Sequence, residues 1–238
     1  MLFRSQHLAG PSLAALNERI AGYEQEIALV TLAPELPGAQ EVIAALQQRG
    51  ILVSLGHSEA SESQAAEAFA TGVGMITHVC NAMAGLHHRA PGPIAAAALR
   101  GDVALGLIAD GVHVAPSMAV LLQRLMPEQV LLVSDALAPY GLADGVHRWD
   151  QRALIVENGS CRLEDGTLAG VTLPLLEAVR RLASWSGDAD RAIAAATVLP
   201  RRLLGAPDGA AAQLLGLPLA QTLRWSGDAA NLRWQWAA

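Results

Sequence analysis

Five runs of hydrophobic residues along the chain each stop at polar residues of the kinds that bind metals or transfer protons. Continuous apolar runs are typical of strands that a parallel sheet buries on both faces. In a parallel β/α barrel the carboxyl ends of all strands face one rim, where the active site forms. We therefore expect the polar residues that end these runs to meet in space. The runs cover residues 30–35, 51–58, 75–81, 105–113 and 130–135.

Segments with apolar residues at helical spacing separate these runs. Two of the predicted helices stop at Gly50 and Gly72, as a helix does at a left-handed C-terminal residue. The alternation predicts a parallel α/β architecture up to about residue 140. The predicted helices cover residues 13–22, 38–49, 63–71, 94–100 and 116–125.

The pattern changes after Asp135. Residues 154–156 and 160–163 flank Asn158–Gly159, a dipeptide typical of a tight β-hairpin turn. A second turn is predicted at 164–166. The C-terminal residues alternate tryptophans with polar residues, which predicts an edge strand or a hairpin. Two further helices are predicted, at 173–184 and 191–196.

Composition excludes several classes of protein. The net charge of −6 over 238 residues argues against general binding to nucleic acid or to an anionic membrane. The two cysteines build no disulfide framework, which fits a reducing compartment. No signal peptide is recognisable, and no apolar run reaches the ~20 residues that span a bilayer. We expect a soluble, cytoplasmic protein.

Three strand ends carry candidate residues for hydrolysis. A hydrolytic metal site needs about three protein ligands and an open position for water. His57 and His78 end neighbouring strands and are candidate metal ligands; the alternative for each is a buried histidine bonded to the backbone. Asp135 ends the last strand, where it could orient and deprotonate a water molecule. Its alternative role is that of a helix N-cap.

Two further residues are candidates for binding substrate. His113 follows Asp110–Gly111, which by itself is a turn signal, and its place at a strand end would let it contact a substrate. Arg89 lies in a loop rich in glycine, proline and histidine, where its guanidinium could hold an anion. A solvated loop arginine is the alternative.

Together these motifs resemble the N-acetylglucosamine-6-phosphate deacetylases, amidohydrolase-superfamily enzymes with a metal-dependent β/α barrel and a small β domain. The resemblance covers roughly residues 25 to 205. It rests on seven motifs in order: Thr-Leu-Ala-Pro-Glu at 31–35, Gly-His-Ser at 56–58, Thr-His-Val-Cys-Asn-Ala-Met at 77–83, Gly-Leu-His-His-Arg at 85–89, Ala-Asp-Gly-Val-His at 109–113, Ser-Asp-Ala at 134–136 and Asp-Gly-Thr-Leu-Ala-Gly at 165–170.

The resemblance implies a role for each matching residue. His57 and His78 match metal ligands, and Asp135 matches the catalytic aspartate. The residues that match substrate-binding positions are Asn81, the backbone at Ala82, Arg89, His113 and the closing loop Leu168, Ala169 and Gly170. The implied cofactor is a divalent metal ion, with zinc favoured and iron or another ion open. The implied partner is a small-molecule sugar phosphate, and the implied assembly is a homodimer.

The resemblance also implies a division of the chain. Residues 1–140 would form the C-terminal portion of the barrel, with only five strand–helix units. Residues 141–172 would hold the β-hairpin region and the closing loop, 173–205 the closing helices of the barrel, and 206–238 a C-terminal β tail. We therefore expect a chain that begins after the first barrel strands.

One departure from the family concerns the metal site. The family's glutamate ligand has no counterpart here. The His-Leu-Ala-Gly-Pro segment at 7–11 looks like the glutamate segment with Ala9 in its place, but it lies too close to Thr31 to be its equivalent, so we expect the chain to begin after the glutamate. The predicted reaction is removal of the acetyl group from N-acetylglucosamine 6-phosphate. Three alternatives stay open: an inactive fragment, a non-catalytic relative that binds sugar phosphate, and an amidohydrolase acting on another N-acyl or cyclic amide.

Overall fold

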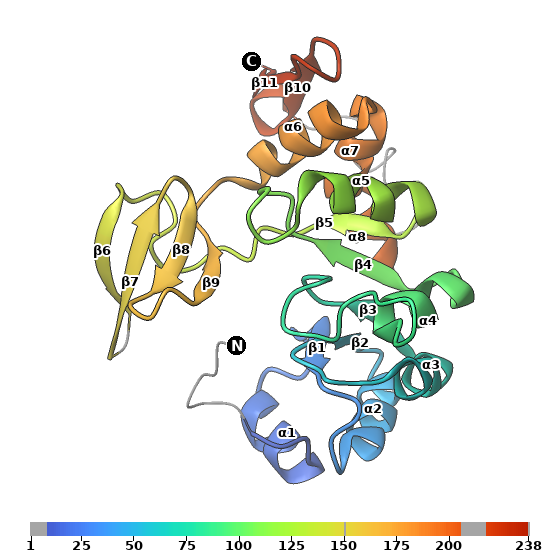
Figure 1. The fold of residues 1–238 in the computed structure, drawn as a ribbon. Coiled ribbons are helices and arrows are strands. Elements are labelled where there is room, and N and C mark those ends of the chain that lie inside the picture. Colours follow the sequence, from blue (N-terminus) through green and yellow to red (C-terminus); the bar gives the residue numbers. More distant parts are fainter. Residues whose placement is uncertain (1–8, 150, 206–217, 238) are drawn as a thin grey trace. The chain divides into compact units, whose positions relative to one another are not determined.

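The computed structural model describes residues 9–149, 151–205 and 218–237. These form two compact units, Met1–Gly106 and Leu107–Ala238, and the division falls inside strand β4 (Ala104–Leu107). Figure 1 follows the chain through both units. Within the described residues, no helix is long and apolar enough to cross a membrane.

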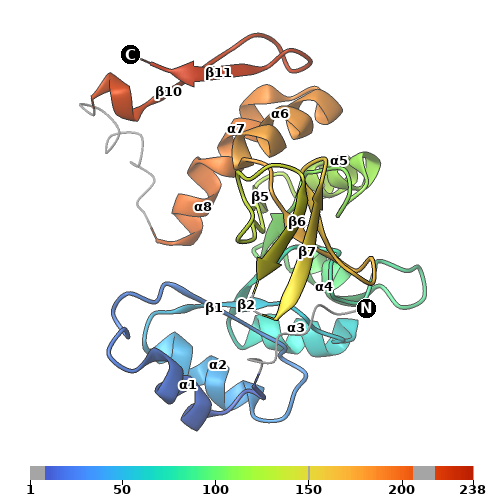
Figure 2. The ribbon, with the colours of Figure 1, turned by 90° about the vertical axis from the view of Figure 1, so that its left-hand side faces the viewer.

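The first unit contains the parallel strands that the hydrophobic runs predict. β1 (Leu29–Leu32) pairs with β2 (Leu52–Leu55), β2 with β3 (Val73–Ile76), and β3 with β4, all in parallel. The connecting helices are α2 (Ala39–Gln48), α3 (Glu62–Ala70) and α4 (Gly92–Arg100). A further helix, α1 (Leu13–Ile20), lies beside α2 (Figures 1 and 2). The prediction of strand–helix alternation is confirmed.

Local sequence explains where the helices begin and end. Ser61 forms a capping box with Gln64 at the start of α3: its hydroxyl accepts the Gln64 N–H, and the Gln64 side chain accepts the Ser61 N–H. Gly101 ends α4 in the left-handed conformation that glycine adopts without strain. These signals can be read from the sequence alone.

Large apolar side chains from the strands and helices form the core of the first unit. Each is less than 2% exposed, so burial of these side chains supplies the main stabilisation of the sheet. They are Ile43, Leu46, Leu55, Phe69, Ile76, Ile94 and Leu105.

The second unit begins with the end of β4. The N–H of Val133, after β5 (Val130–Leu132), donates to the carbonyl of Leu107 at 3.0 Å. The hydrogen-bonded order of the parallel sheet is therefore β1-β2-β3-β4-β5. Helix α5 (Pro116–Leu125) has the bounds that the sequence predicts.

An antiparallel sheet with the order β6-β7-β8-β9 follows in the second unit. Its strands are β6 (Gly145–Trp149), β7 (Arg152–Glu157), β8 (Ser160–Leu163) and β9 (Leu168–Val171). Asn158 and Gly159 join β7 to β8, both with positive φ as a type I′ turn requires, so the predicted hairpin is confirmed. β6 was not predicted, because its mostly exposed residues show no apolar alternation.

Helices and a hairpin complete the second unit. α6 (Leu175–Ser186) is displaced by two residues from its prediction, because Pro174 stands at its N-cap. α7 (Ala189–Ala196) is capped by Asp188, and the unpredicted α8 (Val198–Leu203) follows it. Figure 2 shows these helices in succession. After the short helix η1 (Leu219–Gln221), β10 (Leu223–Ser226) and β11 (Arg233–Trp236) form the predicted hairpin, with Trp225 opposite Trp234.

Gly159 and Gly166 offer a matched test of turn energetics. Both have a φ near +80°, but a Cβ at Gly159 would lie 2.3 Å from Leu173 Cγ, whereas a Cβ at Gly166 would meet nothing within 4 Å. We expect Gly166→Ala to cost about 1–2 kcal/mol of unfolding free energy from backbone strain alone. Gly159→Ala should cost more, because a clash is added. Urea denaturation of both variants checks this, and equal losses would contradict it.

Candidate active site

His57 and His78 lie together at the ends of β2 and β3. Their Nε2 atoms are 3.0 Å apart, and the two rings meet edge to face at a centroid distance of 4.7 Å. His78 is buried, and its Nδ1 atom has no hydrogen-bond partner among the described residues. Two imidazole nitrogens that converge in this way are the donors that divalent transition metals prefer.

The backbone at these strand ends is strained. Six described non-glycine residues have positive φ, and five of them lie at the sequence-predicted site or next to it: His57, His78, Cys80, Ala82 and Asp135. Such conformations cost free energy and persist only where the surroundings impose them. Their concentration at the strand ends indicates that these turns are shaped for function.

The turn that carries His57 is held by Glu35, which follows β1. One oxygen of the Glu35 carboxylate accepts the Ser58 hydroxyl at 2.7 Å, and the other accepts the Glu59 N–H at 2.7 Å. Ser58 is fully buried, and its own N–H donates to the carbonyl of Ala82 at 3.0 Å. Glu35 thus uses both oxygens to fix the residues directly after His57.

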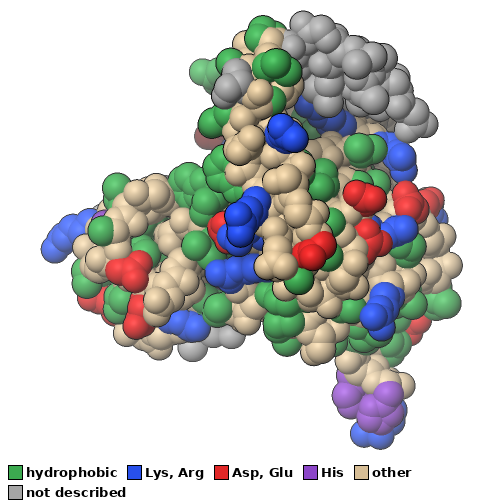
Figure 3. All heavy atoms as spheres, turned by 90° about the horizontal axis from the view of Figure 1, so that it is seen from above, with side chains coloured by type: hydrophobic (Ala, Val, Ile, Leu, Met, Phe, Trp, Pro, Cys, Tyr) green, Lys and Arg blue, Asp and Glu red, His purple; other side chains and the backbone are tan. Residues whose placement is uncertain are grey.

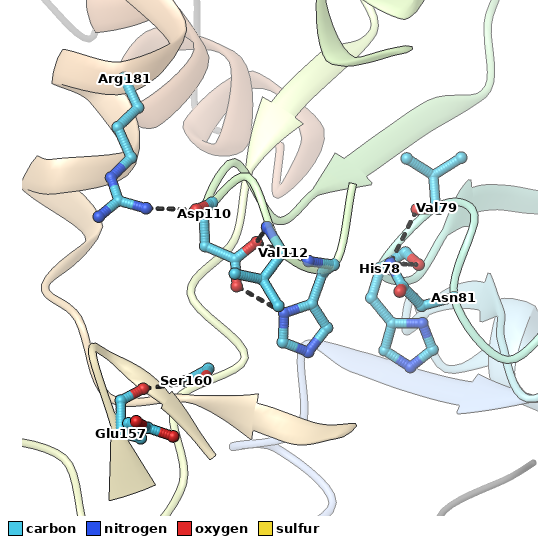
Figure 4. Close-up of polar contacts among 9 residues, drawn as sticks. His78, Val79, Asn81, Asp110, Val112, Glu157, Ser160 and Arg181 are labelled. Atoms are coloured by element: carbon cyan, nitrogen blue, oxygen red, sulfur yellow. Dashed lines mark hydrogen bonds and ion pairs between the residues drawn. The ribbon is translucent and has the colours of Figure 1, made fainter. Parts of the chain in front are cut away.

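The turn that carries His78 is closed by Asn81. The Asn81 side-chain amide donates to the carbonyls of His78 and Val79 at 3.2 and 3.1 Å (Figure 4). Its backbone N–H also donates to the His78 carbonyl at 2.9 Å. The hydrogen bond from Ser58 to Ala82 joins this turn to the His57 turn. Four sequence-predicted residues of the first unit, His57, His78, Asn81 and Ala82, are thereby brought together.

Hydroxyl groups from three adjacent strand positions form a chain. Thr77 Oγ1 lies 2.6 Å from Ser54 Oγ and 3.0 Å from Thr31 Oγ1. Gly56 leaves room for them, since a Cβ there would lie 2.7 Å from Thr31 Cγ2. Thr77 directly precedes His78 and Gly56 directly precedes His57. These hydroxyl–hydroxyl contacts therefore fix the backbone from which both histidines project.

Arg89 lies on an exposed loop. Its guanidinium contacts His88 Nε2 at 2.7 Å, and His88 stacks obliquely against His87. All three residues are exposed, and histidine and basic side chains stand out together from the surface in Figure 3. The structure therefore leaves Arg89 accessible to an anion.

Asp135 and the predicted closing loop are joined in the second unit. The carbonyl of Asp135 accepts the Val171 N–H at 3.1 Å, and Ala136 bridges to Val171. A Cβ at Gly170 would lie 2.8 Å from the Asp135 carbonyl oxygen. Strand β9, which contains Leu168, Ala169 and Gly170, therefore packs directly against the turn that presents the exposed Asp135 side chain.

His113 pairs with Asp110 in the same unit. Asp110 Oδ2 lies 2.6 Å from His113 Nδ1, and both side chains are almost fully buried. Asp110 Oδ1 accepts the N–H groups of Val112 and His113, and Arg181 donates to the Asp110 carbonyl (Figure 4). Burial raises the pKa of Asp110, but the hydrogen bonds from His113 and from the backbone outweigh it, so the pKa is lowered overall.

The histidine pair fits two positions around a metal ion. Metal–imidazole bonds of about 2.0–2.1 Å allow two nitrogens 3.0 Å apart to bind one ion. Among the described residues, no group of three or more histidine, cysteine, aspartate and glutamate side chains could hold a metal. Of the 7–11 segment that resembles the family's glutamate motif, residues 7 and 8 lie outside the described residues.

Known proteins similar to this chain are, by their names, deacetylases of N-acetylated amino-sugar 6-phosphates. An N-acetylgalactosamine-6-phosphate deacetylase of Escherichia coli O157:H7 is 37% identical over 194 residues, which are 81% of this chain and 52% of the relative. An N-acetylglucosamine-6-phosphate deacetylase of Bos taurus is 37% identical over 84% of this chain and 51% of its own length. No protein-family model matches the chain.

Solved structures agree with the sequence relatives. The N-acetylglucosamine-6-phosphate deacetylase of Thermotoga maritima matches with a TM-score of 0.74 at 34% identity, over 82% of this chain and 53% of that one. An aspartate-to-alanine variant of the Mycobacterium smegmatis enzyme, in complex with N-acetyl-D-glucosamine-6-phosphate, matches with a TM-score of 0.79 at 32% identity, over 83% and 54%. The chain is homologous to the N-acetylglucosamine-6-phosphate deacetylases.

The match to these deacetylases is partial in length. The chain spans about half the length of the curated relatives it matches, while they match about four-fifths of the chain. The resemblance drawn from the motifs is confirmed. The coarse fold, a parallel sheet with added antiparallel strands, is confirmed as well.

In this deacetylase homologue, Asp110 and Glu35 make contacts that the sequence does not predict. The sequence indicates only a turn at Asp110, and the structure adds a buried hydrogen bond between its carboxylate and His113. Glu35 was noted at a strand end, but its hold on Ser58 and Glu59 was not foreseen. The available signal in each case was an acidic residue that directly follows an apolar run, where a lone carboxylate needs partners.

We expect His57→Gln and His78→Gln each to weaken zinc binding by at least about 10-fold, because each removes one of the two convergent imidazoles. Competition titration against a chromophoric chelator measures this. His88→Gln is the matched control, since His88 lies on the exposed loop. Unchanged zinc affinity in both variants would show that this pair binds no metal.

Proposed function

We propose that this protein takes part in the metal-dependent removal of the acetyl group from N-acetylglucosamine 6-phosphate, which gives glucosamine 6-phosphate and acetate. The convergence of His57 and His78 Nε2 at the ends of β2 and β3 carries the proposal. Homology to the sugar-phosphate deacetylases narrows the substrate class. A cytoplasmic location and a role in amino-sugar catabolism go with this activity.

The fold proposed for this activity is a β/α barrel of the amidohydrolase type, of which β1 to β5 are five strands. The similarity to solved deacetylase structures supports it. Among the described residues, β1 has a strand partner on one side only. An apolar groove of about 320 Å³ borders it, lined in part by Leu16, Val30, Leu32 and His57. Further strands along this edge would extend the sheet.

His57 and His78 are proposed to hold the divalent ion, with zinc favoured because imidazole suits it; iron is the alternative. When bound, the ion supplies a Lewis acid that polarises the acetamide carbonyl and acidifies water. Glu35 and Asn81 keep the two imidazoles aimed at that ion, since they fix the turns on which the histidines sit.

Asp135 is proposed as the proton carrier. It takes the proton of the attacking water as the new C–O bond forms, and it gives that proton to the nitrogen as the C–N bond breaks. The side chain is exposed, and the carbonyl is tied to Val171, so the carboxylate is accessible while its backbone is fixed. Leu168, Ala169 and Gly170, on the strand tied to Asp135, are proposed to close over the substrate.

The remaining residues are proposed to hold the sugar phosphate. Arg89 contributes charge to the phosphate, and the exposed position of its loop would let it reach a neighbouring copy in a homodimer. Asn81, the backbone at Ala82 and His113 contact other polar groups of the substrate.

Acetate release from N-acetylglucosamine 6-phosphate with added zinc tests the proposal. We expect Asp135→Asn to lower kcat by about 10²–10⁴-fold, because the amide cannot carry the proton. Exposed Asp144→Asn is the control. Equal measurable rates in the wild type and in Asp135→Asn would contradict the catalytic role of Asp135, and no acetate release from either would favour a non-catalytic sugar-phosphate-binding protein.

The galactosamine epimer is a second candidate substrate, because the Escherichia coli relative acts on N-acetylgalactosamine 6-phosphate by its name. Parallel assays with both phosphorylated sugars and with an unphosphorylated N-acyl substrate separate these activities. Turnover of the unphosphorylated substrate alone would favour a different amidohydrolase.

Arg89→Gln should raise KM for the phosphorylated sugar by about 10-fold or more, because a charge-assisted contact to phosphate is lost. kcat should change little, since the guanidinium is proposed to bind the phosphate and not the reacting amide. Exposed Arg100→Gln is the control. A KM that stays unchanged would remove Arg89 from the substrate site.

A further inference from the structure

Asp110 carries more hydrogen bonds than a turn-forming aspartate needs. Its Oδ1 atom accepts the Val112 N–H at 2.9 Å and the His113 N–H at 2.8 Å, which closes the turn. Its Oδ2 atom is left over and lies 2.6 Å from His113 Nδ1. The His113 and Asp110 side chains are only 5% and 6% exposed. The second oxygen therefore serves the imidazole ring and is not needed for the turn.

The protonation of this pair follows from the hydrogen-bond inventory. An ionised carboxylate only accepts hydrogen bonds, so Nδ1 of His113 must carry the hydrogen between them. The lowered pKa of Asp110 agrees with the ionised form. In the neutral ring the hydrogen on Nδ1 leaves a lone pair on Nε2. The two ring nitrogens then have distinct and fixed roles.

The backbone that carries the Asp110 carboxylate is held in place by its neighbours. Gly111 takes a φ of +77°, so the chain can turn back and bring His113 onto the Asp110 side chain. From α6, Arg181 donates to the Asp110 carbonyl, and Trp185 packs near Gly111. Arg181 is a charged group of the second unit that contacts this turn. Because the turn is held in this way and Oδ1 is occupied by the two backbone N–H groups, Oδ2 can fix the orientation of the ring.

We propose that Asp110 is a positioning residue that holds His113 in its Nδ1-protonated tautomer and presents Nε2 to the substrate. Substrate contact by His113 rests on the proposed function, whereas the fixed tautomer does not. The arrangement matches the general pattern in which a buried carboxylate sets the tautomer of a functional histidine.

Long-range ¹H–¹⁵N correlation spectra of the whole ¹⁵N-labelled chain, recorded at a pH where the ring is neutral, read the tautomer directly. The His113→Gln spectrum assigns the signals of His113 by their loss. We expect the wild type to show hydrogen on Nδ1. A wild-type ring with hydrogen on Nε2 would overturn the proposal, even if every Asp110 variant failed to fold.

Asp110→Asn is the informative variant because it keeps the shape of the side chain. Its single amide oxygen should stay with the two backbone N–H groups, so its NH₂ group would face Nδ1 and force the hydrogen to Nε2. We expect this switch of tautomer, together with a loss of about 10–100-fold in kcat/KM. The control variant Asp102→Asn, at an exposed aspartate, should change neither the tautomer of His113 nor kcat/KM. An unchanged tautomer in Asp110→Asn would overturn the proposal.

The spectra and the assay test two hypotheses separately: the positioning role of Asp110 and the proposed deacetylase activity. A tautomer switch in a chain that releases no acetate from either phosphorylated sugar would sustain the role of Asp110 and reject the proposed deacetylase activity. Full activity in Asp110→Asn despite the switch would reject the positioning role in catalysis.

Discussion

Parallel strand pairing is the constraint on which the site depends. Because β1, β2 and β3 run in the same direction and in close register, their carboxyl ends lie at one edge of the sheet. Glu35, His57 and His78 therefore come together although 43 residues separate the first from the last. Burial of apolar side chains such as Leu55, Phe69 and Ile76 stabilises this pairing. The polar residues at the strand ends contribute chemistry and cost stability.

That cost is visible as positive φ at both histidines and at Asp135, and short polar contacts offset it. Glu35 holds the His57 turn through two hydrogen bonds, and Asn81 holds the His78 turn through its side-chain amide. Asp110 does the same for the turn of His113. In each case one polar residue close to a candidate site histidine holds its turn in a single conformation, and at His57 and His78 that conformation is strained.

Much of the fold can be predicted because its signals are local. Apolar runs predicted β1 to β5, the Asn158–Gly159 pair predicted the β7–β8 hairpin, and Gly50 and Gly101 marked helix ends. β6 escaped prediction because an exposed edge strand has no apolar pattern, and α6 begins two residues late because Pro174 occupies its N-cap. A short strand that is stabilised mainly by pairing with its neighbour has little pattern in its own sequence from which it could be predicted.

The sequence by itself determined which residues are candidates for the chemistry, because strand-end histidines, an aspartate and a loop arginine are visible as residue types at fixed spacings. It also determined the kinship with sugar-phosphate deacetylases, which the comparisons confirm. Only the tertiary structure decided which nitrogen atoms face each other and which carboxylate braces which turn. The reason is physical: hydrogen bonds act over about 3 Å, and chain folding alone brings such distant residues within that range.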